Sequence, residues 1–451
     1  MLMKKLTVNL ICILCTIIFS SIGADAQLSL SAQLRARSEM RDGQGAPLSH
    51  GSKPATFISQ RSRLNASFIA HRLKLNMSVQ DVRVWGQDIS QINRNTTETN
   101  NGLMLHEAWA EVLLSDTANR NSSFSIKMGR QEIIYDDHRL LGNLDWLQQA
   151  RRHDALIAKF QAGRWSLHAG AAYNQNKESA SGTIYDNTSP GYAATTNGGT
   201  MYKSMQFFYA GKKLMKGSAS FLLFSDQFNR YQMETVNNVP AKDFLPGVWT
   251  RVTTGFYFTN SFKELDVTAA AYYQTGKNNN GVKLDAAMAS LAVQHSFGKF
   301  SFGPGVDYTS GGGTTTKSKT FDPLYGTAHK FWGFMDYFYA GSPFGKAGLV
   351  DYYLKTKWKP AERLAVTGDY HHFNSAAVIP NVTDTAKKLG DEIDIVATYN
   401  LTKLVSLEGG YSHYFSTGLL TSPLVKNIPD ARSSANWAYI MINIKPEFLF
   451  K

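Results

Sequence analysis

Pairs of arginines spaced two residues apart are the residues of this 451-residue chain best suited to bind a solute. Arg35 and Arg37 form one such pair, and Arg61 and Arg63 form another. Successive side chains of a β-strand point to opposite faces, so this spacing places both guanidinium groups of a pair on the same face. A guanidinium group binds a carboxylate through two parallel hydrogen bonds. The pairs therefore predict a basic surface that attracts anions.

Two lysines and two glutamates extend this surface. Lys74, Lys127, Glu107 and Glu111 alternate with apolar neighbours, so they fall on the polar face of their strands. If these strands span a membrane, a charge on the lipid side costs about 2–4 kcal/mol near the midplane, so the polar face would be the inner one. Two interpretations remain open: the charges guide anions along the wall, or they pair with one another and hold the wall together.

The densest run of charge lies between two apolar stretches, from Gly129 to Asp154. Its candidate residues near the pore are Arg130, Glu132, Arg139, Asp145, Arg151, Arg152 and Asp154. Alternation fails here, because Arg130 and Glu132 have the parity of the apolar residues before them. Either a bulge at Gly129 switches the face of the sheet to which the following side chains point, or the strand has already left the membrane. Both cases predict a charged connection folded into or over the pore.

The chain contains no pattern typical of an enzyme or a metal site. His106-Glu107 lacks a second histidine at position 110, which is Ala110, so the zinc-protease helix motif is missing. No nucleophile-elbow or phosphate-binding glycine motif occurs. His371 and His372 could bind a metal together with a loop acid, but a solvated strand end is the favoured explanation of this pair. We predict no enzymatic activity, no metal and no cofactor.

Alternation of apolar and polar residues predicts successive β-strands along the rest of the chain. In the first stretch Leu28, Leu30 and Leu34 share one face while Gln33 and Arg35 share the other. The expected strands cover residues 28–37, 57–70, 72–85, 102–114, 122–134, 153–161, 165–174, 200–214, 217–228, 250–260, 263–275, 285–297, 299–308, 349–358, 362–373, 390–400, 403–414 and 437–449. This is about eighteen strands, and sixteen stays open because turn boundaries are uncertain by several residues.

Short and long connections alternate between these strands. Short ones are expected at Lys216-Gly217, at Gly298-Lys299 and at residues 359–362. Long ones are expected at residues 86–101, 175–199, 229–249, 309–348, 374–389 and 415–436. This asymmetry is typical of outer-membrane barrels, which have short periplasmic turns and long extracellular loops. The sequence therefore predicts an all-β fold, a transmembrane antiparallel β-barrel of about eighteen strands.

The first 26 residues have the pattern of a cleaved signal peptide. Lys4 and Lys5 precede an apolar run, and Ala24-Asp25-Ala26 supplies small residues before the expected cut. Both cysteines, Cys12 and Cys15, lie in this segment, so the mature chain has no thiol. We expect residues 27–451 to form a single barrel domain in the outer membrane of a Gram-negative bacterium, in contact with its lipid.

Three motifs resemble the alginate-export family of outer-membrane barrels. They are Gly129-Arg130-Gln131-Glu132 with the charged run that follows it, the segment from Asp322 to Phe338, and Leu389-Gly390-Asp391-Glu392-Ile393-Asp394. Together they span nearly the whole mature chain. The resemblance implies eighteen antiparallel strands with a basic constriction that passes a uronate polymer, although members of the family need not handle alginate.

A channel is therefore the expected function. Its solute would be an alginate-like anionic polysaccharide or a related small anion, and the alternative is a general or small-acid-specific porin for diffusive uptake. Export would require a periplasmic partner at the short turns. A binding or adhesion protein on a barrel base is disfavoured by the lack of a large soluble domain. Nucleic-acid binding is disfavoured because the basic residues alternate along strands. We expect a monomeric barrel.

Overall fold

The computed structural model describes residues 26–86, 102–116, 118, 121–175, 201–340, 347–379 and 387–450. The expected signal peptide, residues 1–26, lies almost entirely outside this part of the chain, as do most of the connections 86–101 and 175–199. Within the described residues, no helix is long and apolar enough to cross a membrane.

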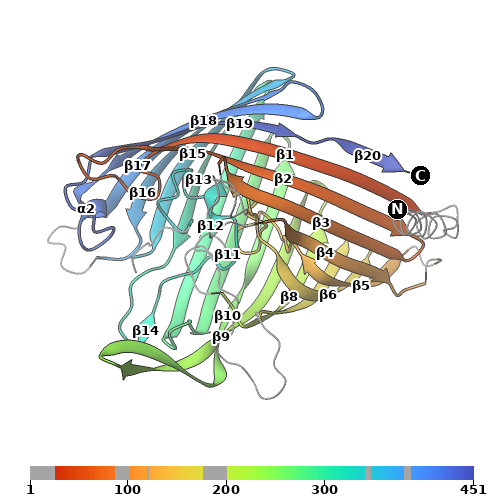
Figure 1. The fold of residues 1–451 in the computed structure, drawn as a ribbon, viewed down its shortest axis with the longest axis horizontal. Coiled ribbons are helices and arrows are strands. Elements are labelled where there is room, and N and C mark those ends of the chain that lie inside the picture. Colours follow the sequence, from red (N-terminus) through yellow and green to blue (C-terminus); the bar gives the residue numbers. More distant parts are fainter. Residues whose placement is uncertain are drawn as a thin grey trace, which may run out of the picture.

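Long antiparallel strands build the fold, and they form one continuous sheet (Figure 1). The strands are β1 (Gln27–Asp42), β2 (Ala55–Ala70), β3 (Leu73–Val84), β4 (Met104–Leu113), β5 (Ser122–Gln131), β6 (His153–Ala162), β7 (Trp165–Tyr173), β8 (Ser204–Lys213), β9 (Gly217–Val236), β10 (Val239–Phe262), β11 (Leu265–Lys277), β12 (Lys283–Phe297), β13 (Phe300–Thr309), β14 (Lys317–Ser318), β15 (Leu349–Ala361), β16 (Leu364–Ser375), β17 (Lys388–Asn400), β18 (Val405–Ser416), β19 (Ser434–Ile444) and β20 (Glu447–Phe450). Two short helices of the described residues, η2 (Ala328–Lys330) and α2 (Gly418–Thr421), lie in the connections.

The sheet closes on itself at β1. This strand pairs with β2 on one side and with β19 and β20 on the other, so that Arg35 lies opposite Arg61 in one register and Asn443 in the other. β20 continues β19 after Lys445-Pro446, where proline lacks the N–H that the ladder would use. β14 is a two-residue segment inside a connection. Eighteen strands therefore form the wall, as predicted, and sixteen is excluded.

Among the connections that lie within the described residues, most are confirmed, but the one predicted at 229–249 is wrong. β9 and β10 continue through it as a long hairpin whose turn is Asn237-Asn238. Both asparagines have positive φ, 50° and 63°, a conformation that asparagine tolerates and that suits a two-residue hairpin turn. The turn expected at 359–362 is also displaced: β15 runs to Ala361 past an irregularity after Trp358.

The two faces of the wall differ in polarity. Leu64 and Leu156, which are 51% and 50% exposed, point away from the barrel axis together with other large apolar residues. Arg35 and Arg61 point inward and are 4% and 1% exposed. An outer apolar band with a polar interior is the arrangement that lipid requires, because closure satisfies the backbone hydrogen bonds without water.

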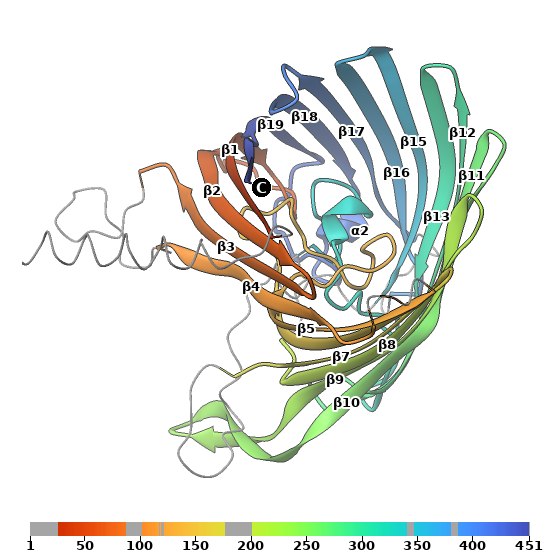
Figure 2. The same ribbon diagram turned by 90° about the vertical axis from the view of Figure 1, so that its right-hand side faces the viewer.

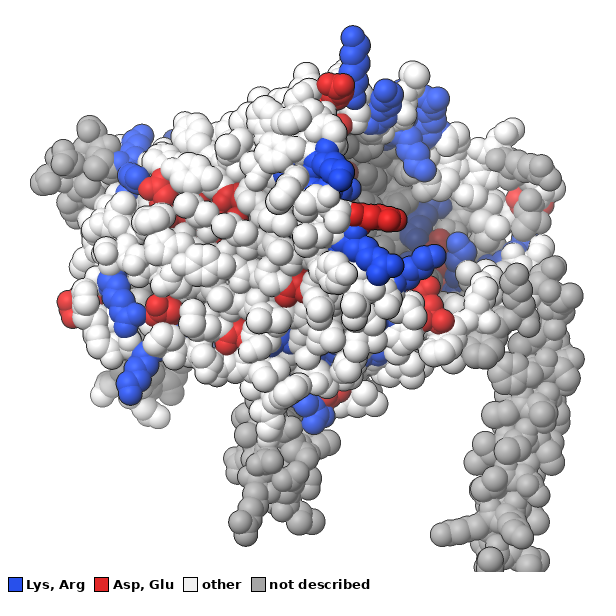
Figure 3. Space-filling view, turned by 90° about the horizontal axis from the view of Figure 1, so that it is seen from above, with Lys and Arg blue, Asp and Glu red and all other residues white. Residues whose placement is uncertain are grey.

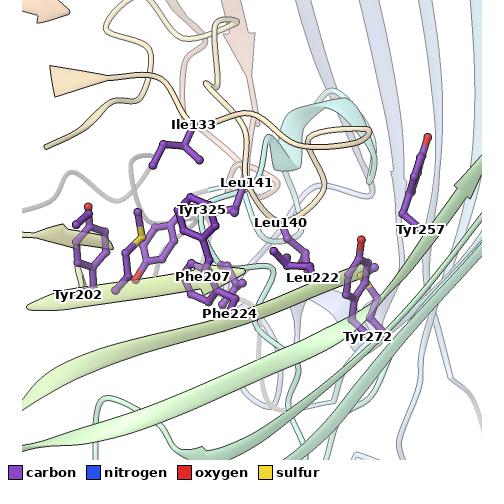
Figure 4. Packing of buried hydrophobic residues seen from close by; sticks show 14 of the residues in the cluster. Ile133, Leu140, Leu141, Tyr202, Phe207, Leu222, Phe224, Tyr257, Tyr272 and Tyr325 are labelled. Atoms are coloured by element: carbon purple, nitrogen blue, oxygen red, sulfur yellow. The ribbon is translucent and has the colours of Figure 1, made fainter. Parts of the chain in front are cut away.

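Two connections enter the barrel and pack inside it (Figure 2). They are the β5–β6 connection, residues 132–152, and the β13–β15 connection, described over 310–340 and 347–348. A parallel bridge between Leu141 and Tyr325 joins them. Figure 4 shows Leu140, Leu141 and Tyr325 packed against Phe207 and other inward residues of the wall. A second apolar cluster, around Trp332 and Trp437, holds the later connection against β16–β19. The hydrophobic core thus lies within the lumen.

Candidate functional site

The four arginines of β1 and β2 lie side by side on the inner wall. The register places Arg35 opposite Arg61 and Gln33 opposite Arg63. The 132–152 connection contacts them from inside the barrel: Arg35 Nε donates to Gln148 Oε1 at 2.9 Å and Nη1 donates to the Asp145 carbonyl at 2.8 Å. The basic surface predicted from the spacing is therefore one continuous patch, partly covered by this connection.

Asp145 is the carboxylate that faces three of these arginines. Its Oδ1 lies 2.8 Å from Arg61 Nη1 and 3.9 Å from Arg63 Nη1, and its Oδ2 lies 3.4 Å from Arg35 Nη1. Burial opposes ionisation of Asp145, but the attraction of Arg61 and Arg35 outweighs it and holds the pKa of this carboxyl below its ordinary value. The 132–152 connection is thus fixed to the wall by a charged carboxylate.

Arg37 is held by a different set of groups. Its Nε donates to Glu39 Oε1 at 2.8 Å, and its Nη1 donates to the Trp146 carbonyl at 2.9 Å. The guanidinium carbon lies 4.1 Å from the centroid of the Trp146 ring. Arg41 also binds Glu39, at 3.0 Å. The patch therefore carries excess positive charge, because only two carboxylates of the described residues, Glu39 and Asp145, pair with its five arginines. These arginines are Arg35, Arg37, Arg41, Arg61 and Arg63.

The remaining predicted wall residues form a second, nearly neutral group on β3–β6. Lys74 lies opposite Glu111, and Glu111 Oε2 accepts a bond from Lys159 Nζ at 3.0 Å. Lys127 Nζ lies 3.9 Å from the centroid of the Trp109 ring. Glu107 accepts from the Trp109 indole N–H at 3.1 Å. All four side chains face the lumen, where pairing within the wall accounts for the two glutamates.

Two arginines of the charged segment, Arg139 and Arg151, hold the inner connections in place. Arg139 Nη1 donates to Asp307 Oδ2 at 2.5 Å. Arg151 Nη1 donates to the carbonyl of Tyr325 and, at 2.6 Å, to that of Gly326. Each arginine therefore joins the 132–152 connection to the second connection or to the opposite wall.

Glu132 and Arg152 lie beside β4. Glu132 Oε1 lies 2.9 Å from His106 Nε2, and its Oε2 accepts from the Asn143 amide at 2.8 Å. Arg152 Nη2 lies 3.9 Å from Met104 Sδ. Both residues therefore lie where the connection leaves and rejoins the wall.

Arg130 and Asp154 lie elsewhere. They form a two-bond ion pair across β5 and β6, at 2.9 and 2.8 Å, and they share the face of Met128 and Leu156, which is exposed on the outside of the barrel. Gly129 before them has a φ of 120°. These two residues of the charged segment therefore do not join the lumen cluster, because alternation continues to the strand end.

Sequence reasoning missed a third charged group on the inner wall. Arg251 of β10 binds Asp226 of β9 at 2.9 and 2.5 Å, and it reaches Asp322 of the inner connection at 2.6 Å. The Tyr325 hydroxyl donates to Asp226 at 2.9 Å. The alternation of β9 and β10 places Asp226 and Arg251 on the inner face, so the signal was present, but residue 251 stood at the edge of an expected loop.

This arrangement defines an outer-membrane β-barrel with the architecture of a channel: apolar outside, charged inside and narrowed by its own connections. The chain belongs to the alginate export family, because the family model described as Alginate export matches residues 26–419. The family resemblance inferred from the motifs is confirmed. No curated protein matches the chain significantly.

Solved structures share the fold at low sequence identity. OccAB4 of Acinetobacter baumannii is 12% identical with a TM-score of 0.60, and the match covers 94% of this chain and 99% of that one. OccK3 (OpdO) of Pseudomonas aeruginosa is 12% identical with a TM-score of 0.59, covering 95% and 98%. The outer membrane protein OpdK of Pseudomonas aeruginosa is 10% identical with a TM-score of 0.56, covering 93% and 99%.

Proposed function

We propose that this protein is an anion-selective channel of the outer membrane that passes an anionic polysaccharide, or solutes with the same acidic groups. The observation that carries the proposal is the patch on β1 and β2, where five arginines share two carboxylates on the inner wall. Wall charges act on a solute within the screening length of about 8 Å at physiological salt, so a pore narrowed by its connections keeps every solute in their range. Membership of the alginate export family supports a uronate polymer as the solute.

The arginines suit transport better than tight binding. Arg35, Arg37 and Arg61 are buried and are already held by the wall or by the 132–152 connection, so their charge acts on a passing carboxylate without trapping it by direct contact. Conduction requires sites that bind the solute strongly enough for it to enter the pore and weakly enough for it to leave. We propose transport without catalysis by a monomeric barrel, with a periplasmic partner at the short turns if the polymer is exported.

Diffusive uptake of small acids is the second candidate. The apolar clusters that fill much of the lumen favour it, because they narrow the path. OpdK, which shares the fold, has been solved with vanillate. A small solute needs less room than a polymer, so conduction of monomers without block by oligomers would favour this candidate.

Single-channel recording in a planar bilayer tests the proposal. The wild type should show an anion-selective reversal potential in a salt gradient, and a uronic-acid oligomer should block its current. Replacing Arg35, Arg37, Arg61 and Arg63 together by Gln should shift the reversal potential toward cations, because four fixed charges leave the wall. An unchanged reversal potential would remove these arginines from the conduction path. Conductance indifferent to the oligomer would leave a porin for small acids.

A further inference from the structure

A second basic site lies at the short-turn end of the wall, away from the arginine patch. Here β12, β13 and β15 surround a cavity of about 290 Å³. Its lining consists of Gln294, Ser296, Gly298, Lys299, Phe300, Ser301, Lys357 and Lys359. We call this cavity the mouth site. Its volume matches the lower end of ligand pockets, about 300 Å³, which suits a single sugar-sized or smaller group.

The register shows that the mouth site faces the lumen. Ser301 lies opposite Ser296 on one side and Lys357 on the other, so these three side chains share a face. The next residue, Trp358, is 51% exposed on the opposite face, where aromatic residues meet lipid at the membrane boundary. The lysines thus line the inside of the barrel mouth, which is periplasmic in barrels with short turns at that end.

The charges of the mouth site are not balanced by the protein. Lys299 Nζ donates to the Pro360 carbonyl at 2.9 Å, which holds its ammonium group at the cavity. Among the described residues, Lys357 and Lys359 have no ion-pair partner. One step deeper, Lys355 is paired with Asp369 at 3.2 Å. Three ammonium groups around one cavity, with no carboxylate in its lining, repel each other until an anion neutralises them.

Polar groups of the mouth site could complete the coordination of an anion. The Gln294 amide donates to the Ser301 hydroxyl oxygen at 3.3 Å, which leaves the hydroxyl hydrogen of Ser301 available for an acceptor. Lysine ammonium groups each have three donors and no acceptor. The cavity therefore offers positively charged hydrogen-bond donors and one hydroxyl donor, and an oxyanion can accept hydrogen bonds from both.

The other lysine group of the inner wall differs from the mouth site. In the ring of eighteen strands β4 and β5 are the fourth and fifth, and β13 and β15 are the thirteenth and fourteenth, so the two groups lie on opposite walls. On the β3–β6 wall, Glu107 and Glu111 offset two of the three lysine charges. Figure 3 shows Lys and Arg side chains, with some Asp and Glu side chains among them, around a hollow on one face of the molecule. The uncompensated positive charge at the mouth is therefore one-sided.

We propose that the mouth site binds one carboxylate-bearing unit of the transported solute at the periplasmic opening, before or after the solute passes the arginine patch. This inference rests on the proposed transport of anions and adds a second, separate contact for the same solute. A solute that enters from the periplasm meets the mouth site first, which raises its local concentration there.

The test compares block by sodium glucuronate added to either side of a bilayer. The orientation of the channel is read with Ala118→Cys, an exposed position in the β4–β5 turn, and an impermeant thiol reagent; the chain has no cysteine after residue 26. The wild type should be blocked at lower glucuronate concentration from the short-turn side. Lys357→Gln with Lys359→Gln should raise the half-blocking concentration on that side about fivefold. The matched control is Lys263→Gln with Lys403→Gln, in other short turns outside the cavity, and it should change nothing.

The outcomes separate the mouth site from the proposed function. If the wild type is anion-selective but block is equal from both sides and insensitive to the double Gln variant, the mouth site is refuted and the channel proposal stands. If side-dependent block is lost in the variant while the wild type shows no anion preference, the mouth site stands and the arginine patch loses its role. Lys357→Arg with Lys359→Arg should keep the block. Loss of block when the short-turn leaflet contains anionic phosphatidylglycerol would assign the site to lipid headgroups and overturn the proposal.

Discussion

At the scale of single residues, Asp145 determines how much of the arginine charge reaches a solute. It is the carboxylate shared by Arg35, Arg61 and Arg63, and it belongs to a connection and not to the wall. Spacing alone predicted that the arginines share a face. It could not predict that a residue about 110 positions later lies against them, because only the path of the connection inside the barrel brings Asp145 there.

Asp145→Asn should increase anion selectivity and lower stability. The variant removes one negative charge beside three guanidinium groups. The reversal potential should therefore move further toward the equilibrium potential of the anion. We expect the free energy of unfolding to fall by about 1–2 kcal/mol, below the 3–5 kcal/mol of a fully buried pair, because the Asp145 side chain is 42% exposed. Asp154→Asn is the control: it breaks the outer pair with Arg130 and should leave the reversal potential unchanged. Equal shifts in both variants would contradict the assigned placements.

The effect of Asp145 should persist at mildly acidic pH. Its pKa lies below the ordinary value, so the stabilisation is complete above the unfolded-state pKa of about 3.9 and is lost as pH falls through the lower folded-state value. Wild type and Asp145→Asn should therefore keep the same difference in thermal midpoint between pH 8 and pH 5. A difference that disappears already near pH 6 would mean that Asp145 is not held by the arginines.

At the scale of elements, alternation predicted the wall well and the connections poorly. All eighteen wall strands were expected, because one face must be apolar for lipid and the other polar for the lumen. The extension of the β9–β10 hairpin over residues 229–249 was missed because it leaves the apolar band and carries polar residues on both faces. The inward course of the 310–340 segment was also missed, since aromatic and glycine residues pack there only against distant strands.

Gly333 is the residue on which the docking of this segment depends. Its φ is +79°, and a Cβ there would collide with the Glu392 carboxylate, which accepts the backbone N–H of Met335 at 2.7 Å. Gly333→Ala should loosen the segment at a cost of about 1–3 kcal/mol, so single-channel current should become noisier and the thermal midpoint should fall. Gly418→Ala, where a Cβ meets nothing within 4 Å, is the control. A quiet channel with unchanged midpoint would show that the segment is anchored elsewhere.

At the scale of the whole molecule, the barrel wall and the connections inside it are held together by different interactions. The wall is a closed hydrogen-bonded ladder that satisfies its own backbone, whereas the inner connections are held by apolar packing and by arginines that cross between them. Changes in the inner connections should therefore alter conductance and ion selectivity without unfolding the barrel, because the hydrogen-bonded ladder closes without these connections.

Replacing residues 136–150 by a Gly-Ser linker tests this separation. The variant removes Asp145 and the Leu140–Leu141 packing but keeps the four arginines on the wall. We expect a folded barrel with the heat-dependent gel migration of closed barrels, a conductance several-fold above the wild type, and anion preference at least as strong, because the arginines lose a carboxylate and keep their strands. Unchanged conductance would place the path away from this connection. A chain that no longer folds would show that the inner core, and not the ladder alone, closes the barrel.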